Sequence, residues 1–209
     1  MSLSLCITCC DLDFHLLDGL LDEFQKQTVA PNEIIISSSG ISDESLDKYK
    51  DLKINQEIVD IKITNNRQRH FQSVARNLGA ANSAFEYIMF FDVDDFPHPK
   101  KIELCMENVK GLDFLLHNYF PNPEHNSFSY SAIPSLSDLL IDSSCTNLRV
   151  IPDHAIHHSH ITVKKSIFNS IKYNESIDFY RKEDGKFCQD LVNSGYKGKY
   201  LNLPLVNYR

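Results

Sequence analysis

Three carboxylates follow directly on an apolar run of the sequence. Residues 87–91 read Tyr-Ile-Met-Phe-Phe, and they lead into Asp92, Asp94 and Asp95. An apolar run without polar alternation indicates a strand covered on both faces, as in a parallel sheet flanked by helices. Ligands of such sheets bind beyond the carboxyl ends of the strands. Because carboxylate oxygens suit Mg²⁺ and Mn²⁺, and because these ions hold diphosphates, the pattern predicts a metal-assisted nucleotide site.

The elements that must position these acids alternate between strands and helices. Apolar runs predict strands at residues 5–9, 33–37, 58–63 and 87–91. Apolar residues at helical spacing, with capping signals, predict helices at residues 16–24, 43–52 and 71–81, and from Pro99 onward. This alternation predicts an α/β fold, in which a Rossmann-like, mostly parallel central sheet carries helices on both faces.

The second half of the chain is less regular. Residues 120–135 are rich in proline, asparagine and serine, which is typical of a surface loop, and loops over a cleft commonly select the substrate. After this loop, the sequence predicts a strand at residues 160–163, a helix at residues 184–194 ended by Gly195, and a closing strand at residues 203–209.

Length, charge and cysteine content limit the possible classes of protein. The 209 residues suit one domain, 1–209, with a sizeable core. A formal net charge of -7 argues against binding to nucleic acid or anionic lipid, since both require a basic surface. No stretch reaches the roughly 18 apolar residues of a membrane span, and the first residues lack a signal pattern. We therefore expect a cytoplasmic protein without a membrane span, whose six cysteines take no part in chemistry.

The acidic motif belongs to a longer recognisable string. Residues 75–81 read Ala-Arg-Asn-Leu-Gly-Ala-Ala, and residues 86–99 read Glu-Tyr-Ile-Met-Phe-Phe-Asp-Val-Asp-Asp-Phe-Pro-His-Pro. The string closely resembles that of family-2 glycosyltransferases of the GT-A fold, which typically have ARNxGxxxAxGEYIxFLDADDxxxP there. The resemblance covers residues 4–110 well and residues 158–209 more loosely. It implies a GT-A fold and a nucleotide-diphosphate sugar as the donor.

The resemblance also implies a role for each matched residue. It makes Asp92 a contact to ribose or metal, Asp94 the principal ligand of Mn²⁺ or Mg²⁺, and Asp95 a supporting member. Arg76 corresponds to an arginine that faces the nucleotide. Thr8, near the end of the first strand, matches another nucleotide contact.

One departure from the family concerns the base of the nucleotide. Relatives end the second strand with Asp-Asp-Gly-Ser, whose first aspartate commonly bonds to the base, whereas this chain has Ser38, Ser39, Gly40 and Ile41 there. A hydroxyl group donates or accepts a hydrogen bond, while a carboxylate only accepts, so this position does not fix a preference for uracil. Ser38 and Ser39 are the predicted contacts, with UDP as first choice and other nucleotides open.

Sugar transfer with inversion also requires a group that takes the proton of the acceptor hydroxyl. The pair Glu183 and Asp184 resembles the family's Glu-Asp motif, in which the aspartate is the base, and Phe187 and Leu191 match the apolar helix behind it. The alternative is that both acids only favour the dipole of the helix that they begin. The resemblance implies a donor half at residues 1–110 and an acceptor and base half at 111–209.

Four histidines stand close together at His154, His157, His158 and His160. Imidazoles at this density suit zinc, but no cysteine or carboxylate pair is placed to complete a structural site. A second interpretation is that His158 and His160, two apart on one face of a strand, line the cleft near the metal or acceptor, with His160 as a candidate metal ligand. A third is that they are surface histidines on a loop that enters a strand.

Three functions follow from these patterns. A non-processive transferase acting on a glycan or glycoprotein is favoured, because the Gln-x-x-Arg-Trp motif of processive synthases is missing and the chain has no tryptophan. A catalytically silent nucleotide or sugar binder would keep the same fold, and the serines at the second strand fit that alternative. A metal-dependent phosphatase of the haloacid-dehalogenase type also carries Asp-x-Asp after an apolar strand, but normally on its first strand.

Overall fold

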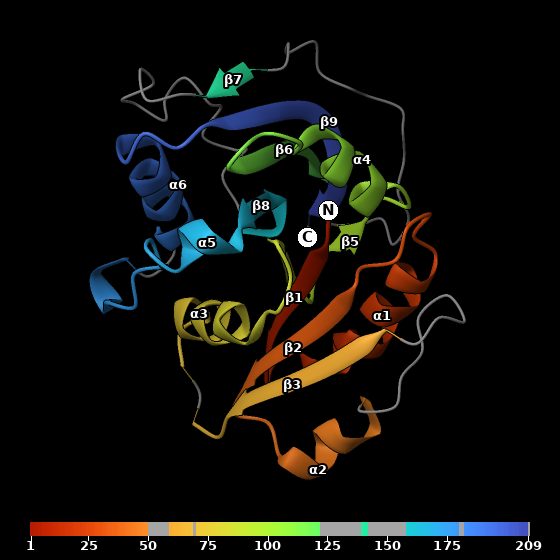
Figure 1. The fold of residues 1–209 in the computed structure, drawn as a ribbon. Helices are drawn as coiled ribbons and strands as arrows, with labels where there is room; N and C mark the ends of the chain where they lie inside the picture. Colours follow the sequence, from red (N-terminus) through yellow and green to blue (C-terminus); the bar gives the residue numbers. More distant parts are fainter. Residues whose placement is uncertain (50–58, 69, 122–138, 142–157, 180–181, 209) are drawn as a thin grey trace.

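The computed structural model describes residues 1–49, 59–68, 70–121, 139–141, 158–179 and 182–208. Within these residues, one mixed sheet runs through the molecule and carries helices on both faces (Figure 1).

The first half of the chain builds a parallel part of the sheet. Its strands are β1 (Leu3–Cys10), β2 (Glu33–Ser39), β3 (Asp60–Asn66) and β4 (Tyr87–Asp92). Strand β1 pairs in parallel with both β2 and β4, and β2 pairs in parallel with β3. The apolar run in β4 is completely buried, as a strand covered on both faces requires. The third strand begins at Asp60, two residues after its predicted start at residue 58.

Helical segments connect these strands. They are η1 (Phe14–Leu16), α1 (Leu17–Gln25), α2 (Asp43–Leu46), η2 (Asp47–Tyr49) and α3 (Gln72–Asn82). Helix α1 buries three leucines and a phenylalanine at helical spacing. The Ser42 hydroxyl accepts the Ser45 N–H and so caps α2, as expected, but the α-helix gives way to a 3₁₀ turn at Asp47. Residues 50–52 of the predicted helix lie outside the described residues.

The second half adds strands in both directions. Its strands are β5 (Phe96–Pro97), β6 (Phe114–Pro121), β7 (Leu139–Ile141), β8 (Ile161–Lys164) and β9 (Gly198–Tyr208). Its helical segments are α4 (Lys101–Asn108), η5 (His158–His160), α5 (Lys165–Phe168), η6 (Ile177–Phe179) and α6 (Glu183–Asn193). The strand order is β3-β2-β1-β4-β8-β6-β9-β5, with β7 paired to β9. The predicted α/β fold with a mostly parallel central sheet is confirmed, and β8 is antiparallel to both β4 and β6.

Three boundaries in this half differ from the prediction. The strand predicted at residues 160–163 begins at Ile161, because residues 158–160 form a 3₁₀ turn. His158 and His160 therefore do not share one face of a strand. The closing strand starts at Gly198, five residues before the predicted start, and the helix expected from Pro99 begins at Lys101.

Side chains of the sheet divide between two cores. Leu5 and Ile7 of β1 join a cluster with α1 and α4, whereas Cys6 between them joins a second cluster with α3, α5 and α6. The same alternation occurs in β4, where Phe91 faces the first cluster and Phe90 the second. This period of two is the pleat of the strand. The helices thus cover both faces and leave the carboxyl ends of β1, β2 and β4 to form a site.

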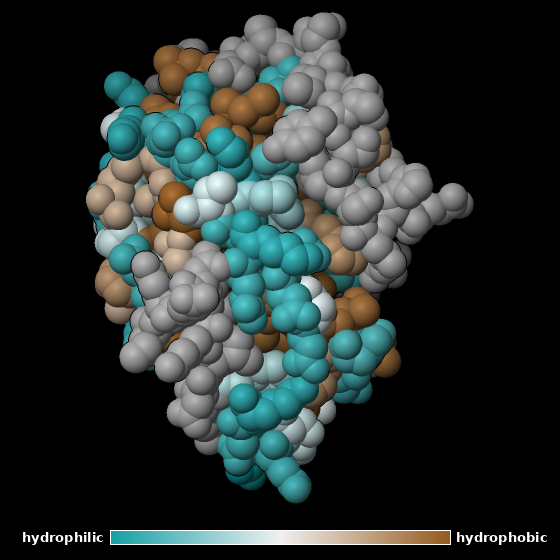
Figure 2. All heavy atoms as spheres, turned by 90° about the vertical axis from the view of Figure 1, so that its right-hand side faces the viewer, coloured by the Kyte–Doolittle hydropathy of each residue, from teal (hydrophilic) through white to brown (hydrophobic). Residues whose placement is uncertain are grey.

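Polar and apolar side chains both lie at the surface of the described residues (Figure 2). On the face shown in Figure 2, hydrophilic side chains form a band with hydrophobic areas on either side of it. The large apolar side chains that are exposed in the described residues lie in separate segments of the chain: Met1, Leu12, Val29, Phe71, Leu140 and Ile177. Single exposed side chains of this kind need no functional explanation. Among the described helices, none has the length and apolar character needed to cross a membrane.

Candidate functional site

The parallel register brings two predicted residues into contact at the ends of β1 and β4. Thr8 lies opposite Asp92, and its hydroxyl donates a hydrogen bond to Asp92 Oδ1 at 3.0 Å. Thr8 is itself buried. Neighbouring parallel strands that end together place such side chains at one edge of the sheet. The site therefore begins with a carboxylate whose orientation is fixed from the adjacent strand.

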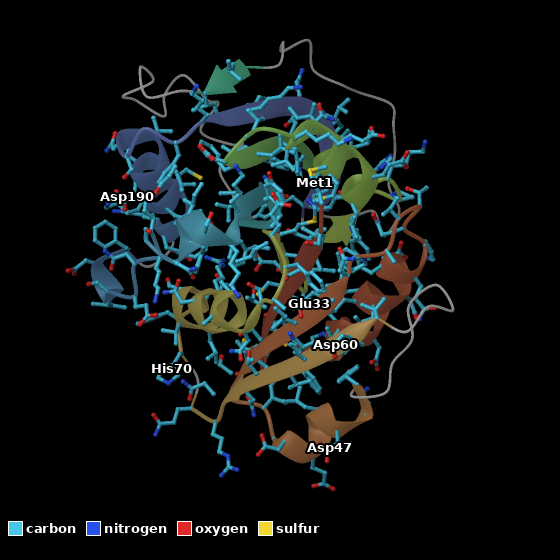
Figure 3. The ribbon with its side chains drawn as sticks, in the orientation of Figure 1. Met1, Glu33, Asp47, Asp60, His70 and Asp190 are labelled. Carbon is cyan, nitrogen blue, oxygen red and sulfur yellow. The ribbon has the colours of Figure 1, made fainter. Side chains whose placement is uncertain are left out.

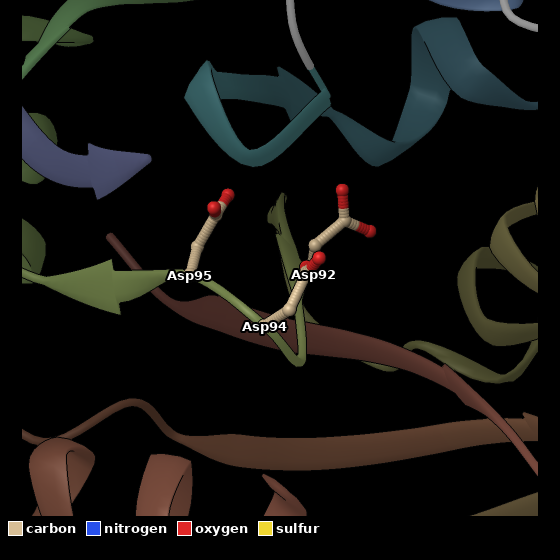
Figure 4. A group of neighbouring side chains, drawn as sticks. All are labelled: Asp92, Asp94 and Asp95. Atoms are coloured by element: carbon tan, nitrogen blue, oxygen red, sulfur yellow. The ribbon is translucent and has the colours of Figure 1, made fainter. Parts of the chain in front are cut away.

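Three carboxylates gather where β4 ends. One ligand oxygen from each of Asp92, Asp94 and Asp95 lies within 4.8 Å of the others (Figure 4). Asp92 and Asp95 point toward the ribbon of η5 and β8, drawn in teal. Asp94 is exposed and Asp95 is buried, so the group has one side open to a ligand. Hard oxygen donors at this spacing fit Mg²⁺ or Mn²⁺, which bind carboxylates and keep positions for phosphate and water.

Arg76 of α3 lies at the centre of the site. Its Nη1 is 3.0 Å from Glu183 Oε1 and 2.9 Å from Asp184 Oδ1, and its Nη2 is 3.8 Å from Asp92 Oδ1. Its Nη2 also donates to Gln72 Oε1 at 3.1 Å. The guanidinium thus joins the end of β4 to the start of α6, although these residues are far apart in the sequence.

Burial and charge act in opposite directions on the groups around Arg76. Burial alone would lower the pKa of Arg76, but Asp184 and Asp92 outweigh it and raise that pKa. For Asp92, burial raises the pKa, Arg76 lowers it, and the nearby carboxylates of Asp95 and Asp94 raise it further, so that the pKa lies well above its usual range. A cation that binds these acids would oppose this shift.

The two acids at the start of α6 differ in access. The Glu183 side chain is 5% exposed and that of Asp184 is 20% exposed. Both lie in the first turn of the helix, as a helix dipole favours. However, both also bond to Arg76, so their placement has a second cause beyond the dipole. Asp184 is the member that a molecule in solution can reach.

Ser38 and Ser39 end β2 beside a hollow at the surface. The Ser38 hydroxyl donates to Asn65 Oδ1 at 3.0 Å, and Asn65 Nδ2 donates to Asp43 Oδ1 at 3.0 Å. Both serines are buried, and the residues that follow them line a hollow of about 420 Å³, together with Arg67: Gly40, Ile41, Ser42 and Asp43. Gly40 adopts a φ of 74°, a conformation that favours glycine and turns the chain at the rim.

His160 lies in η5, directly after Ser159, whose hydroxyl accepts the backbone N–H of Asp92. Its ring is fully buried and stacks on Tyr119, with ring centroids 4.9 Å apart, and it lies 5.1 Å from the ring of His117. It is not one of the three residues whose ligand atoms meet. Its ring nitrogens thus do not lie within 4.8 Å of all three carboxylates, and its role as a metal ligand stays a prediction. His154, His157 and most of the predicted substrate loop lie outside the described residues.

Three residues around the site were not predicted from the sequence. Tyr173 places its ring 5.2 Å from the Arg76 guanidinium carbon, Asn65 joins β3 to the hollow, and Ser159 accepts the backbone N–H of Asp92 at 2.9 Å. Only Asn65 had a detectable cue, because it stands where the third parallel strand ends. The other two come from segments whose positions depend on the complete fold.

Comparison with known proteins places this geometry in a family. Staphylococcus aureus TarS has 16% sequence identity and a TM-score of 0.74, over 99% of this chain and 36% of TarS. TarS in complex with UDP-GlcNAc has 14% identity and a TM-score of 0.75, over 100% of this chain and 58% of that chain. TarS in complex with UDP has 14% identity and a TM-score of 0.72, with 100% and 60% covered. This chain thus spans less than two thirds of those proteins, and at such identities the likeness shows a shared GT-A-like fold.

No curated protein sequence matches the chain significantly. The model of glycosyl transferase family 2, however, matches residues 4–184, which include the acidic cluster, Arg76 and the Glu183–Asp184 pair. The resemblance that the motifs indicated is therefore confirmed, and the chain belongs to glycosyl transferase family 2.

Proposed function

We propose that this chain is a metal-dependent, inverting glycosyltransferase that moves one sugar from a nucleotide-diphosphate sugar to a hydroxyl group of a glycan. The observation that carries the proposal is the position of Arg76, which bonds to Asp184 at 2.9 Å and lies 3.8 Å from Asp92. A proposed base from residues 111–209 and a proposed diphosphate site from residues 1–110 are thereby adjacent. Inverting transfer requires such a pair on opposite sides of the reacting sugar.

Asp184 is the proposed base. Its carboxylate is more exposed than that of Glu183, so an acceptor hydroxyl can approach it. The positive charge of Arg76 favours the ionised form of this carboxylate, which is the form that accepts a proton. Glu183 is buried, and its carboxylate accepts a second hydrogen bond from Arg76 Nη1. Its proposed part in catalysis is to keep the guanidinium, and through it Asp184, in place.

The acidic cluster is the proposed site for Mn²⁺ or Mg²⁺, held by Asp92, Asp94 and Asp95. When bound, such an ion neutralises negative charge on the diphosphate. Thr8 orients Asp92 through its hydrogen bond, and Arg76 stabilises the ionised form of the same carboxylate. The chain itself thus supplies a preorganised set of oxygens, which is what transition-state stabilisation requires.

UDP is the proposed nucleotide, with its base beside Ser38 and Ser39. S. aureus TarS was solved with UDP and with UDP-GlcNAc bound, which supports a UDP-sugar as donor for this chain. Uracil offers two carbonyl oxygens and one N–H. The Ser38 hydroxyl is buried and bonds to Asn65 Oδ1, and the Asn65 amide donates to Ile41 and Asp43, so pairing with uracil would require these groups to exchange their present hydrogen bonds.

Two variants separate donor binding from transfer. Asp94→Ala should abolish the Mn²⁺-dependent binding of UDP, whereas Asp184→Asn should leave that binding intact and reduce transfer by about 10²-fold or more. Calorimetry with UDP and Mn²⁺ measures the first effect, and release of UDP from UDP-GlcNAc measures the second. Asp190→Asn, on the same helix as Asp184 and paired with Lys186 on the surface, is the matched control and should change neither.

The same experiment tests the alternative of a silent binder. Such a protein would bind UDP with Mn²⁺ but would show neither transfer nor slow hydrolysis of a UDP-sugar. The serines of β2 in place of acids favour this second candidate. Normal turnover in Asp184→Asn would instead remove the assignment of the base. Products that carry several added sugars per acceptor would contradict the proposed single addition.

A further inference from the structure

Lys101, the first residue of α4, is a buried cation to which the proposed reaction gives no role. Its side chain is 1% exposed. Its ammonium group bonds to His117 Nε2, donates to the carbonyl of Ser159 at 2.9 Å, and lies 5.3 Å from the ring centroid of Phe91. His117 Nδ1 is 2.7 Å from the Asn118 carbonyl, so Nδ1 carries the hydrogen and Nε2 accepts from Lys101. Three elements, α4, β6 and η5, meet at this one group.

A lysine in this position costs stability. Burial lowers the pKa of Lys101 to about 8, although Cys105 and Asp95 act in the opposite direction. An ammonium group out of water is more expensive than an apolar side chain of the same length. Lys101 is therefore better explained by what its hydrogen bonds hold in place than by a gain in overall stability.

What Lys101 holds is the segment that supports the acidic cluster. Ser159 accepts from Lys101 with its carbonyl and from the backbone N–H of Asp92 with its hydroxyl, at 2.9 Å in each case. Asp92 in turn accepts the backbone N–H of Asp95 at 3.3 Å, closing the turn that carries the three carboxylates. Each link in this chain is a hydrogen bond within or beneath the proposed metal site.

We propose that Lys101 is a positioning residue for the acidic cluster, which acts by fixing Ser159, while Ser159 fixes the backbone of Asp92. The inference rests on the proposed function only in taking this cluster as the place where a divalent ion and UDP bind. Without the link, the turn at residues 92–95 samples arrangements that cannot bind the ion, and the apparent affinity falls by the fraction that remains competent.

Ser159→Ala tests the link without changing any charge. In the presence of saturating UDP, we expect its Mn²⁺ affinity to fall about tenfold, as when one molecule in ten is competent. Lys101→Met should show a similar loss. The double variant should be no weaker than the weaker single variant, because both act through one chain of hydrogen bonds. Lys100→Met removes an exposed charge one residue away and should leave the affinity unchanged.

A second measurement needs no metal. The backbone amide of Asp92 should exchange its hydrogen faster in Ser159→Ala and in Lys101→Met than in the wild type, while Lys100→Met should not differ. Unchanged Mn²⁺ affinity or unchanged exchange in Ser159→Ala would overturn the inference, even if Lys101→Met does not fold. Tighter Mn²⁺ binding by Lys101→Met would also overturn it, since removal of a repelling charge would then dominate. A wild type that does not bind Mn²⁺ with UDP would count against the proposed function instead.

Discussion

Arg76 holds a positive charge in a position that water does not reach. The side chain is 1% exposed, yet its guanidinium contacts the carboxylates of Glu183 and Asp184 directly and lies near that of Asp92. Transfer of such a group out of water costs several kcal/mol, which close carboxylates and hydrogen bonds offset. The balance depends on all partners together. Removal of the arginine would leave three carboxylates close to one another without a counter-charge.

We therefore expect Arg76→Gln to lower the free energy of unfolding by about 3–5 kcal/mol, the range for breaking a buried ion pair. Urea unfolding measures this change. Arg67→Gln is the matched control, because the Arg67–Asp43 pair is 85% and 59% exposed and should contribute under about 1 kcal/mol. A loss in Arg76→Gln as small as that of the control would show that the carboxylates do not need the guanidinium.

For single residues, the sequence predicted the place in a strand or helix better than the residues that each side chain contacts. Asp92 and Asp94 could be placed at the end of a strand because the apolar run that precedes them is local. Arg76 could be assigned to a helix, but not to Glu183, since 107 residues separate the two. Ser159 and Lys101 gave no cue, because a single serine or lysine is most often a surface residue.

Helix α3 packs closely against the sheet at Gly79. A Cβ atom on this residue would stand 2.2 Å from Cys6 Sγ and 3.0 Å from Ser37 Cβ. Both of these side chains come from the strands beneath, β1 and β2, and both are buried. The same helix carries Arg76 three residues earlier. The missing side chain at Gly79 therefore sets how far α3, and with it the guanidinium, lies from the strand ends.

Gly79→Ala should overpack this contact and lower the free energy of unfolding by about 1–3 kcal/mol. Chemical denaturation measures the loss. Cys6→Ala removes the sulfur that the new methyl group would meet. The double variant should therefore recover part of the free energy of unfolding that Gly79→Ala loses. Gly19→Ala, in helix α1 with nothing within 4 Å of its Cβ, should instead gain about 0.5–1 kcal/mol. Equal effects at both glycines would contradict the packing argument.

Elements with a local periodic signal were predictable, and those that depend on distant pairing were not. Helices α1 and α3 and strands β1, β2 and β4 lie within two residues of their predicted starts. Strand β9 begins five residues before its predicted start, because residues 198–201 pair with β6 and β7, which local sequence does not reveal. The strand predicted from residue 160 begins one residue later, because residue 160 belongs to the 3₁₀ turn of residues 158–160.

For the whole molecule, alternation along the chain predicted the fold class but not the order of the later strands. The first four strands follow the parallel pattern that the intervening helices require. Beyond β4, however, β8 stands between β4 and β6, although it comes much later in the chain. No local pattern encodes such a pairing. This arrangement carries η5 to the acidic cluster and α6 to Arg76, so the site exists only in the complete sheet.

Glu33 closes the opposite end of the sheet from the acidic cluster. It begins β2 beside Asp60, the first residue of β3, as Figure 3 shows. Its side chain is fully buried and accepts three hydrogen bonds, from Ser4 Oγ at 2.5 Å, from the Ala84 backbone N–H at 2.6 Å, and from Lys62 Nζ at 2.5 Å. These contacts join β1, β2, β3 and the segment before β4. One carboxylate therefore links the strands of the parallel part of the sheet.

The stability of the molecule should therefore depend on the ionisation of Glu33. Burial alone would raise its pKa, but the hydrogen bonds from Lys62, Ser4 and Ala84 outweigh burial, and the folded pKa is lowered. Because the unfolded chain then binds the proton more tightly, the stabilisation is present above the usual glutamate pKa of about 4.3 and is lost as the pH falls through the folded pKa.

The variant Glu33→Gln tests this dependence, because its amide side chain cannot lose a proton. Its deficit in free energy of unfolding, about 1–3 kcal/mol at pH 7, should shrink as the pH falls from about 6 to about 3. Urea unfolding of both proteins across this range measures the deficit, with the exposed Glu44→Gln as control. If the deficit of Glu33→Gln in free energy of unfolding stayed constant with pH, the negative charge of Glu33 would contribute nothing to stability.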